Sequence, residues 1–204
     1  SNHSYGTVMG WETGNWSGNT GSHWFGTFGE RESRYFGQYS STAVSWDSLH
    51  YNAPYYLAFK AASNDRNDTA PAAGTLYYYY NGAWFSKAYD PALDPYADGW
   101  DAGGYDTMDQ RACAKNIMTV GAVNDAVSSG ARMPANGTMS TFSGWGPTDD
   151  GRVKPDIVAN GVSLYSSVGT SDSSYDGTYS GTSMATPNAA GSAILLVEYY
   201  GARF

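Results

Sequence analysis

Residues 181–187 read Gly-Thr-Ser-Met-Ala-Thr-Pro and begin the segment that we expect to be the central buried helix of the fold. Gly181 permits a tight backbone turn before a helix. The residues up to Tyr200 are small or apolar on nearly every side, which predicts a buried helix. Ser183 then lies near the helix amino terminus, where a serine acts either as an N-cap or as a nucleophile beside free backbone N–H groups. Pro187 is expected to be tolerated because the first helical N–H groups have no intrahelical acceptor.

Apolar runs of strand length precede this helix. They cover residues 55–62, 117–123 and 157–159, with a fourth run over residues 162–168 between the last of them and the helix. Continuous apolar runs are typical of parallel strands that are buried on both faces. A helix predicted over residues 41–52, capped by Ser41 or Thr42, alternates with them. The sequence therefore predicts an α/β fold with a mostly parallel sheet.

Two further segments carry weaker signals. Residues 7–37 are rich in Gly, Trp, Asn and Ser and have no regular apolar period, so we expect a long loop with short strands near residues 23–28 and 35–39. Asn81-Gly82 stands between two aromatic runs and predicts a hairpin with a tight turn.

The motif at residues 181–187 resembles the nucleophile motif of the subtilisin-like serine proteases (subtilases), Gly-Thr-Ser-Met-Ala-Xaa-Pro. Further segments are similar to motifs of that family and occur in the same order. They are Ala-Ala-Ser-Asn-Asp at 61–65, Ala-Lys-Asn-Ile-Met-Thr-Val-Gly-Ala at 114–122, Ser-Thr-Phe-Ser-Gly-Trp-Gly at 140–146 and Val-Lys-Pro-Asp-Ile-Val-Ala at 153–159. Asn160 replaces the usual proline of the last motif. The resemblance implies a three-layer αβα fold that is incomplete at the N-terminal side, as a single partial catalytic domain over residues 1–204.

The resemblance also implies a set of site residues. Ser183 would be the nucleophile, and Asn64 would donate a hydrogen bond to the oxyanion of the tetrahedral intermediate. Two segments would form the walls of the substrate pocket, and the first of them would pair with an extended substrate chain. These segments are Ser4, Tyr5 and Gly6 on one side and Ala61, Ala62 and Ser63 on the other. Ser63 departs from the family, which usually has glycine there.

About 58 residues separate the two wall segments, which is more than in ordinary subtilisins. We therefore expect an aromatic, Gly-rich insertion at about residues 7–40 beside the cleft. Its tryptophans either form a lid that faces the substrate or belong to a surface loop packed on itself.

The triad histidine and aspartate of the family have no match in this sequence. None of His3, His23 and His50 is followed by Gly-Thr, as the family's base is, and no aspartate precedes Ser4. A serine needs a positioned base to become a nucleophile. We therefore expect a partner segment that carries both residues, either on a separate chain after cleavage or in a longer polypeptide. The three histidines are expected to be solvated or structural.

The function that follows is a serine endopeptidase that cleaves polypeptides through an acyl-enzyme, with this chain supplying the nucleophile and the oxyanion hole. The alternative is a non-catalytic subtilase-like module that binds peptide or glycan. The intact motif at residues 181–187 favours the enzyme, because binding alone does not require Ser183.

Composition limits the partners and the compartment. The net charge is −8, which argues against nucleic acid as the main partner, and the apolar run Ala193–Val197 is far too short for membrane insertion. The composition fits a secreted or cell-envelope protein of a bacterium, because aromatic residues are abundant, lysines are few and there is one cysteine. That cysteine, Cys113, is expected to be an inert packed thiol. No cofactor is required. The aspartates of the loop Asp90–Asp109 are either solvated or hold a structural calcium ion; they are Asp90, Asp94, Asp98, Asp101, Asp106 and Asp109.

Overall fold

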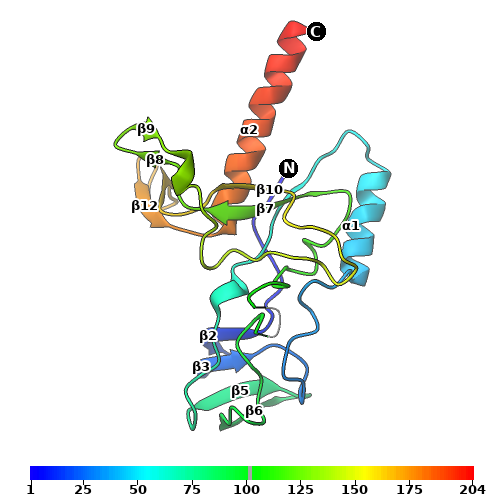
Figure 1. The fold of residues 1–204 in the computed structure, drawn as a ribbon, viewed down its shortest axis with the longest axis vertical. Coiled ribbons are helices and arrows are strands. Elements are labelled where there is room, and N and C mark those ends of the chain that lie inside the picture. The colour runs from blue at the N-terminus through cyan, green and yellow to red at the C-terminus, as the bar shows by residue number, and fades with distance from the viewer. Residues whose placement is uncertain (101–102) are drawn as a thin grey trace.

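A four-stranded parallel sheet forms the centre of the computed structural model, which describes residues 1–100 and 103–204 (Figure 1). Its order is β1 (Asn2–His3), β4 (Phe59–Ala61), β7 (Met118–Val123) and β10 (Ile157–Asn160), with every neighbouring pair parallel. This confirms the α/β class. The run at 117–123 is buried, whereas Ile157 and Val158 of β10, at the edge of the described sheet, are 36% and 46% exposed, so the expected burial of the run at 157–159 is wrong. The run over residues 55–62 is shorter as a strand, because residues 55–57 are exposed and precede the sheet.

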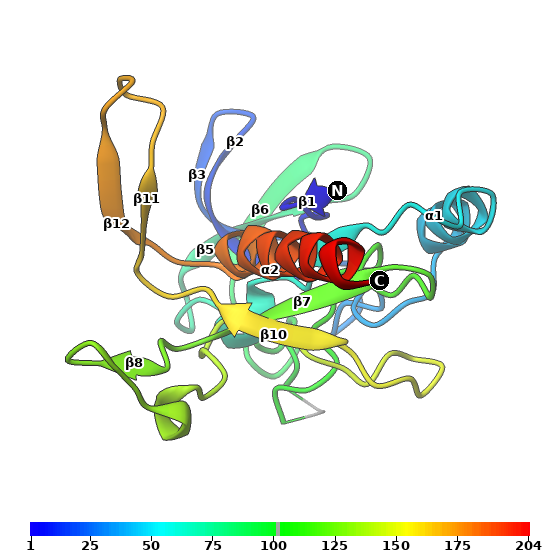
Figure 2. The same ribbon diagram turned by 90° about the horizontal axis from the view of Figure 1, so that it is seen from above.

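Helix α2 covers one face of this sheet, and α1 packs beside it. Helix α2 (Thr182–Arg203) packs through Ala185, Ala189 and Ala190 against Phe59 and Val120. Successive strand side chains point to opposite faces, so the neighbour of Phe59 at position 58 faces away from α2. That residue packs with Ala43 of α1 (Ser41–Tyr51), the helix expected over residues 41–52. Figure 2 shows α2 lying over β7 and α1 at the side of the sheet.

The second half of α2 corrects the expectation of a helix buried on all sides. The apolar side chains Ile194, Leu195, Leu196 and Val197 are exposed, whereas the first three turns are buried on one face. The 22 residues of α2 span about 33 Å. The six residues of β7 span only about 20 Å. The helix therefore runs past the sheet, and its free end projects from the molecule (Figure 1).

The aromatic segments form a second sheet, so the expectation of a long loop over residues 7–37 is wrong. Its order is β2 (Trp11–Trp16), β3 (Asn19–Trp24), β5 (Leu76–Tyr80) and β6 (Trp84–Ala88). The turn between β2 and β3 has positive φ at both central residues, Ser17 and Gly18 (54° and 81°), which matches the twist of a two-residue hairpin. The hairpin expected around Asn81-Gly82 is confirmed as β5 and β6, while no strand covers residues 35–39.

An aromatic core explains why these strands form despite their glycines. Trp11 and Trp24 are 1% and 2% exposed and pack with Tyr77 and Tyr89. The ring centroids of Trp11 and Trp24 lie 5.3 Å apart. Each buried aromatic side chain removes a large apolar area from water, which offsets the low strand propensity of the glycines between them.

The remaining strands lie outside the parallel sheet. The fourth apolar run becomes β11 (Leu164–Ser167), which pairs with β12 (Tyr175–Tyr179) in an exposed antiparallel hairpin, so its expected burial is wrong. A short hairpin pairs β8 (Val127–Ser128) with β9 (Ala131–Arg132). Two single-turn 3₁₀ helices, η1 (Asp65–Asn67) and η2 (Pro134–Asn136), complete the described elements.

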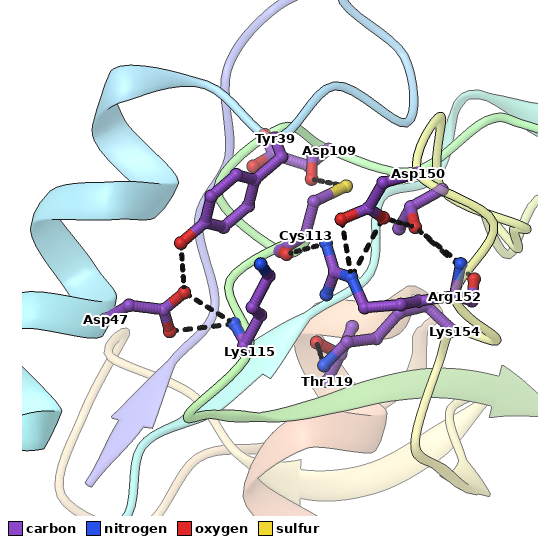
Figure 3. Close-up of polar contacts among 10 residues, drawn as sticks. Tyr39, Asp47, Asp109, Cys113, Lys115, Thr119, Asp150, Arg152 and Lys154 are labelled. Atoms are coloured by element: carbon purple, nitrogen blue, oxygen red, sulfur yellow. Dashed lines mark hydrogen bonds and ion pairs between the residues drawn. The ribbon is translucent and has the colours of Figure 1, made fainter.

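A polar network attaches α1 to the loops that precede β7 (Figure 3). Asp47 of α1 accepts hydrogen bonds from the Tyr39 hydroxyl and from the Lys115 backbone N–H, both at 2.7 Å. The Arg152 guanidinium donates to the Cys113 carbonyl at 2.7 Å. These bonds fix the loop that leads into β7 from both sides, so the strand enters the sheet in one register.

A substitution at Gly161 tests how closely α2 approaches the sheet. A Cβ at this position would lie 2.7 Å from both the Ala122 Cβ and the Gly181 carbonyl oxygen. We expect Gly161→Ala to lower the free energy of unfolding by about 1–3 kcal/mol, because the helix amino terminus must move away from the strand ends. Urea denaturation measures the change. The matched control is Gly169→Ala, where a Cβ meets nothing within 4 Å; equal losses in both variants would contradict the packing described.

Candidate functional site

Ser183 is the second residue of α2, at the helix end that faces the carboxyl ends of the parallel strands. The preceding Gly181 has φ of +155°, a backbone conformation that favours glycine. In the first turn, the N–H groups of Met184 and Ala185 bond to the Gly181 carbonyl and that of Thr182 bonds to Asn64, which leaves the Ser183 N–H without an acceptor among the described residues. Ser183 is half-buried, and its hydroxyl lies 3.4 Å from the Ser4 carbonyl oxygen. The site thus combines a half-buried hydroxyl with the N–H group of Ser183 itself at the positive end of a helix dipole.

Asn64 follows β4 and lies against the start of α2. Its Oδ1 accepts hydrogen bonds from the Thr182 backbone N–H at 2.8 Å and from the Thr182 hydroxyl at 3.0 Å. The single hydrogen of that hydroxyl is shared with the Ser63 carbonyl, which lies 3.1 Å from the Thr182 hydroxyl oxygen. Because Oδ1 accepts from Thr182, Nδ2 is the end of the amide that is left to donate, and Asn64 lines the pocket that also contains Ser183. Nδ2 is 3.6 Å from where a Cβ of Gly181 would stand, and no described residue accepts a hydrogen bond from it.

Pro187 has a role that differs from the one expected. It is the sixth residue of α2, beyond the first turn, so its missing N–H leaves the Ser183 carbonyl without its helical donor. The Ser4 hydroxyl donates to this carbonyl at 2.8 Å. Ser4 therefore completes the hydrogen bonding of the helix at the residue that carries the candidate nucleophile.

Ser63 occupies the position where the family usually has glycine, and its backbone shows why. Its φ is +150°, which L side chains rarely adopt. The Ser63 hydroxyl donates to the Thr107 carbonyl at 2.5 Å, and this bond offsets part of the strain, which is typically about 1–3 kcal/mol. Serine therefore fits at this position without a change in the backbone path of the pocket wall.

A pocket of about 170 Å³ brings most of the expected residues together. Its lining includes four of the six expected wall residues together with the candidate nucleophile and oxyanion donor; these are Tyr5, Gly6, Ala61, Ser63, Asn64 and Ser183. Ala62 is fully buried beneath the wall, where its backbone bonds to Val120 and Asp109, and Ser4 contacts Ser183 as described above. The motif comparison did not single out Thr182, Glu12 and Asp65, which also line the pocket.

The three histidines are bonded or stacked elsewhere in the described structure. The two ring nitrogens of His3 are bonded to the Ser1 hydroxyl and to the Tyr5 hydroxyl, both at 2.8 Å. His23 stacks on Tyr78 in the second sheet, and His50 belongs to α1. Within residues 1–100 and 103–204, no hydrogen bond joins a histidine to Ser183.

The aspartates of the loop Asp90–Asp109 are mostly engaged by the chain itself. Asp94 accepts from the Tyr77 hydroxyl and from Lys87, and Asp98 accepts from the Trp11 backbone N–H; Asp101 lies outside the described residues. Burial raises the pKa of Asp98 to about 9. In the part of the chain that the structure describes, the carboxylates with metal-ligand spacing are instead Glu12, Asp65 and Asp68, whose oxygens lie within 4.8 Å of one another. Calcium in the Asp90–Asp109 loop stays a prediction.

Cys113 is fully buried, and burial raises the pKa of its thiol to about 12, so a thiolate nucleophile is unfavourable there. None of the described helices has the length and hydropathy needed to cross a membrane.

Comparisons with known proteins find protease relatives of this chain. The family model described as "Subtilase family" matches residues 1–202. The serine protease AprX of Bacillus subtilis (strain 168) is 33% identical over 134 residues, which cover 53% of this chain and 29% of AprX. A C5a peptidase of Streptococcus pyogenes is 44% identical over 71 residues, 34% of this chain and 6% of that protein.

Among solved structures, the Clostridium perfringens CspB protease matches 47% of this chain and 18% of that chain, with 34% identity and a TM-score of 0.38. The chain thus spans less than a third of the length of each of these relatives. The family and its protease relatives support a serine protease function. With the family model matched over residues 1–202, the chain belongs to the subtilase family.

Proposed function

We propose that this chain supplies the nucleophile and the oxyanion hole of a serine endopeptidase. The observation that carries the proposal is the position of Asn64, whose Oδ1 is bonded to Thr182, the residue before Ser183, and which lines the same pocket as Ser183. A pure N-cap serine would not need this second donor. The arrangement is the one that acyl transfer requires, with a hydroxyl and preorganised N–H donors at one point.

The reaction follows from this arrangement. Ser183 Oγ attacks the scissile carbonyl carbon, and a base outside the described residues takes its proton. The carbonyl oxygen becomes an oxyanion, which accepts hydrogen bonds from Asn64 Nδ2 and the Ser183 backbone N–H. The amine leaves after it receives a proton, and water then releases the acyl group. An extended polypeptide substrate would form backbone hydrogen bonds along residues 4–6. This pairing would place the scissile carbonyl of the substrate next to the Ser183 hydroxyl. No cofactor takes part.

The triad histidine and aspartate would come from another part of the same protein or from a partner chain. Two features support this proposal. β1 is an edge strand of the described sheet, with β4 on one side and free backbone groups on the other. The free end of α2 also exposes a row of large apolar side chains, a surface that needs a covering element. We place the protein outside the cytoplasm, in the secreted or cell-envelope fraction.

The oxyanion role of Asn64 gives the first test. In the natural protein, we expect Asn64→Ala to lower kcat by about 10²–10³ with little change in KM, because the donor acts only in the transition state; this magnitude is known for subtilisin. Peptide hydrolysis measures both constants, and the Ser183→Ala variant gives the background rate without the nucleophile. The matched control Asn52→Ala removes an exposed amide at the end of α1 and should leave kcat unchanged. An unchanged kcat in Asn64→Ala would reject the proposed role.

The bond from Ser4 to the Ser183 carbonyl gives a second test. We expect Ser4→Ala to lower the free energy of unfolding by about 1–2 kcal/mol, because the partly buried carbonyl loses the donor that stands in for the helical N–H missing at Pro187. Pro187→Ala restores the helical N–H to the same carbonyl. In that background the loss from Ser4→Ala should shrink, and a double-mutant cycle in urea measures the coupling. Strictly additive effects would show that Ser4 does not replace the missing helical bond.

A further inference from the structure

The pocket beside Ser183 is acidic. Three carboxyl groups line it, those of Glu12, Asp65 and Asp109. No lysine, arginine or histidine is among its described lining residues. The carbonyl carbon of the scissile bond would lie at Ser183. The residue that contributes this carbonyl is called P1, and its side chain would enter the pocket beside Ser183.

Asp109 serves the fold rather than the pocket. Its Oδ2 accepts a hydrogen bond from the Thr7 backbone N–H at 2.5 Å, and its Oδ1 accepts one from the Arg111 backbone N–H at 2.7 Å. A Cβ on Gly6 would lie 2.8 Å from Oδ2, so the wall segment rests directly on this carboxylate. Glu12 and Asp65 are the two pocket carboxyls that remain for a substrate.

Glu12 and Asp65 crowd one another and a third carboxyl, that of Asp68, within 4.8 Å. No ion pair within the described ranges neutralises any of the three. Burial and the neighbouring charges of Asp68 and Glu12 raise the pKa of Asp65 well above its usual range. Burial and the charge of Glu12 raise the pKa of Asp68 to about 6. A cation placed among these groups would remove this repulsion.

We propose that the pocket selects a lysine or arginine side chain at P1 and that Glu12 and Asp65 determine this selection. The inference rests on the proposed function, because it takes Ser183 as the point of attack. Asp65 directly follows Asn64, at the start of η1, while Glu12 is carried to the pocket by β2 of the aromatic sheet. The hairpin of β2 and β3 thus supplies a specificity residue to a cleft formed by the parallel sheet.

Matched substrates test this selection in the natural protein. Two peptides differ only at P1, with arginine in one and its neutral isostere citrulline in the other. We expect kcat/KM to be at least about tenfold higher for arginine, as for a desolvated charge pair. Glu12→Gln and Asp65→Asn should each reduce this ratio about tenfold, and urea denaturation checks that each variant is folded. The control Asp172→Asn, in an exposed loop, should keep the ratio.

A binding measurement separates failure of this inference from failure of the proposed function. Agmatine, an alkyl guanidinium, is titrated into the Ser183→Ala protein by calorimetry, where binding that weakens about tenfold in Glu12→Gln supports the pocket even if no peptide is cleaved. A ratio near one for arginine over citrulline in an active enzyme overturns the inference and leaves the protease. Absence of both cleavage and agmatine binding overturns both. Displacement of agmatine by Ca²⁺ at equal concentration would assign the carboxylates to a metal instead and also overturn it.

Discussion

The candidate site depends on the hydrogen bond from the Thr182 backbone N–H to Asn64 Oδ1, which joins residues 118 positions apart in sequence. An amide side chain has one oxygen and one nitrogen end, so occupation of Oδ1 decides where the nitrogen points. The same bond satisfies one of the orphan N–H groups at the start of α2. The position of the helix and the direction of the donor are therefore set together, and any shift of α2 relative to β4 would misalign both.

Ser183 stands where three constraints meet. The backbone of Gly181 lets the chain turn into α2, Pro187 removes the helical donor to the Ser183 carbonyl, and Ser4, the residue after β1, supplies a replacement. The hydroxyl of Ser4 thereby ties the segment expected to bind substrate to the residue expected to attack it. The second sheet approaches the same cleft from the other side and carries Glu12 to the pocket. Substitutions in the second sheet can therefore change the substrate selectivity of the cleft without moving the residues that position Ser183.

Much of this could be predicted from the sequence where the signal is local. The motif at residues 181–187, the buried strands and the turn at Asn81-Gly82 each specify their structure within a few residues. The hairpin of β2 and β3 was missed because its strands contain glycine and asparagine, and their stability comes from Trp11 packing on residues 66 and 78 positions away, Tyr77 and Tyr89. The free end of α2 was misjudged because burial depends on where the sheet ends. The acidic pocket was missed for a similar reason, because Glu12 meets Asp65 only through the contact of two sheets.

The central claim is that Asn64 and the Ser183 backbone together form an oxyanion hole at Ser183. The most direct measurement is a crystal structure of the natural protein after reaction with a fluorophosphonate, whose phosphonyl oxygen mimics the oxyanion. We expect a bond between phosphorus and Ser183 Oγ, with the phosphonyl oxygen about 2.7–3.1 Å from both Asn64 Nδ2 and the Ser183 backbone nitrogen. An adduct on another residue, or a phosphonyl oxygen turned away from Asn64, would contradict this account.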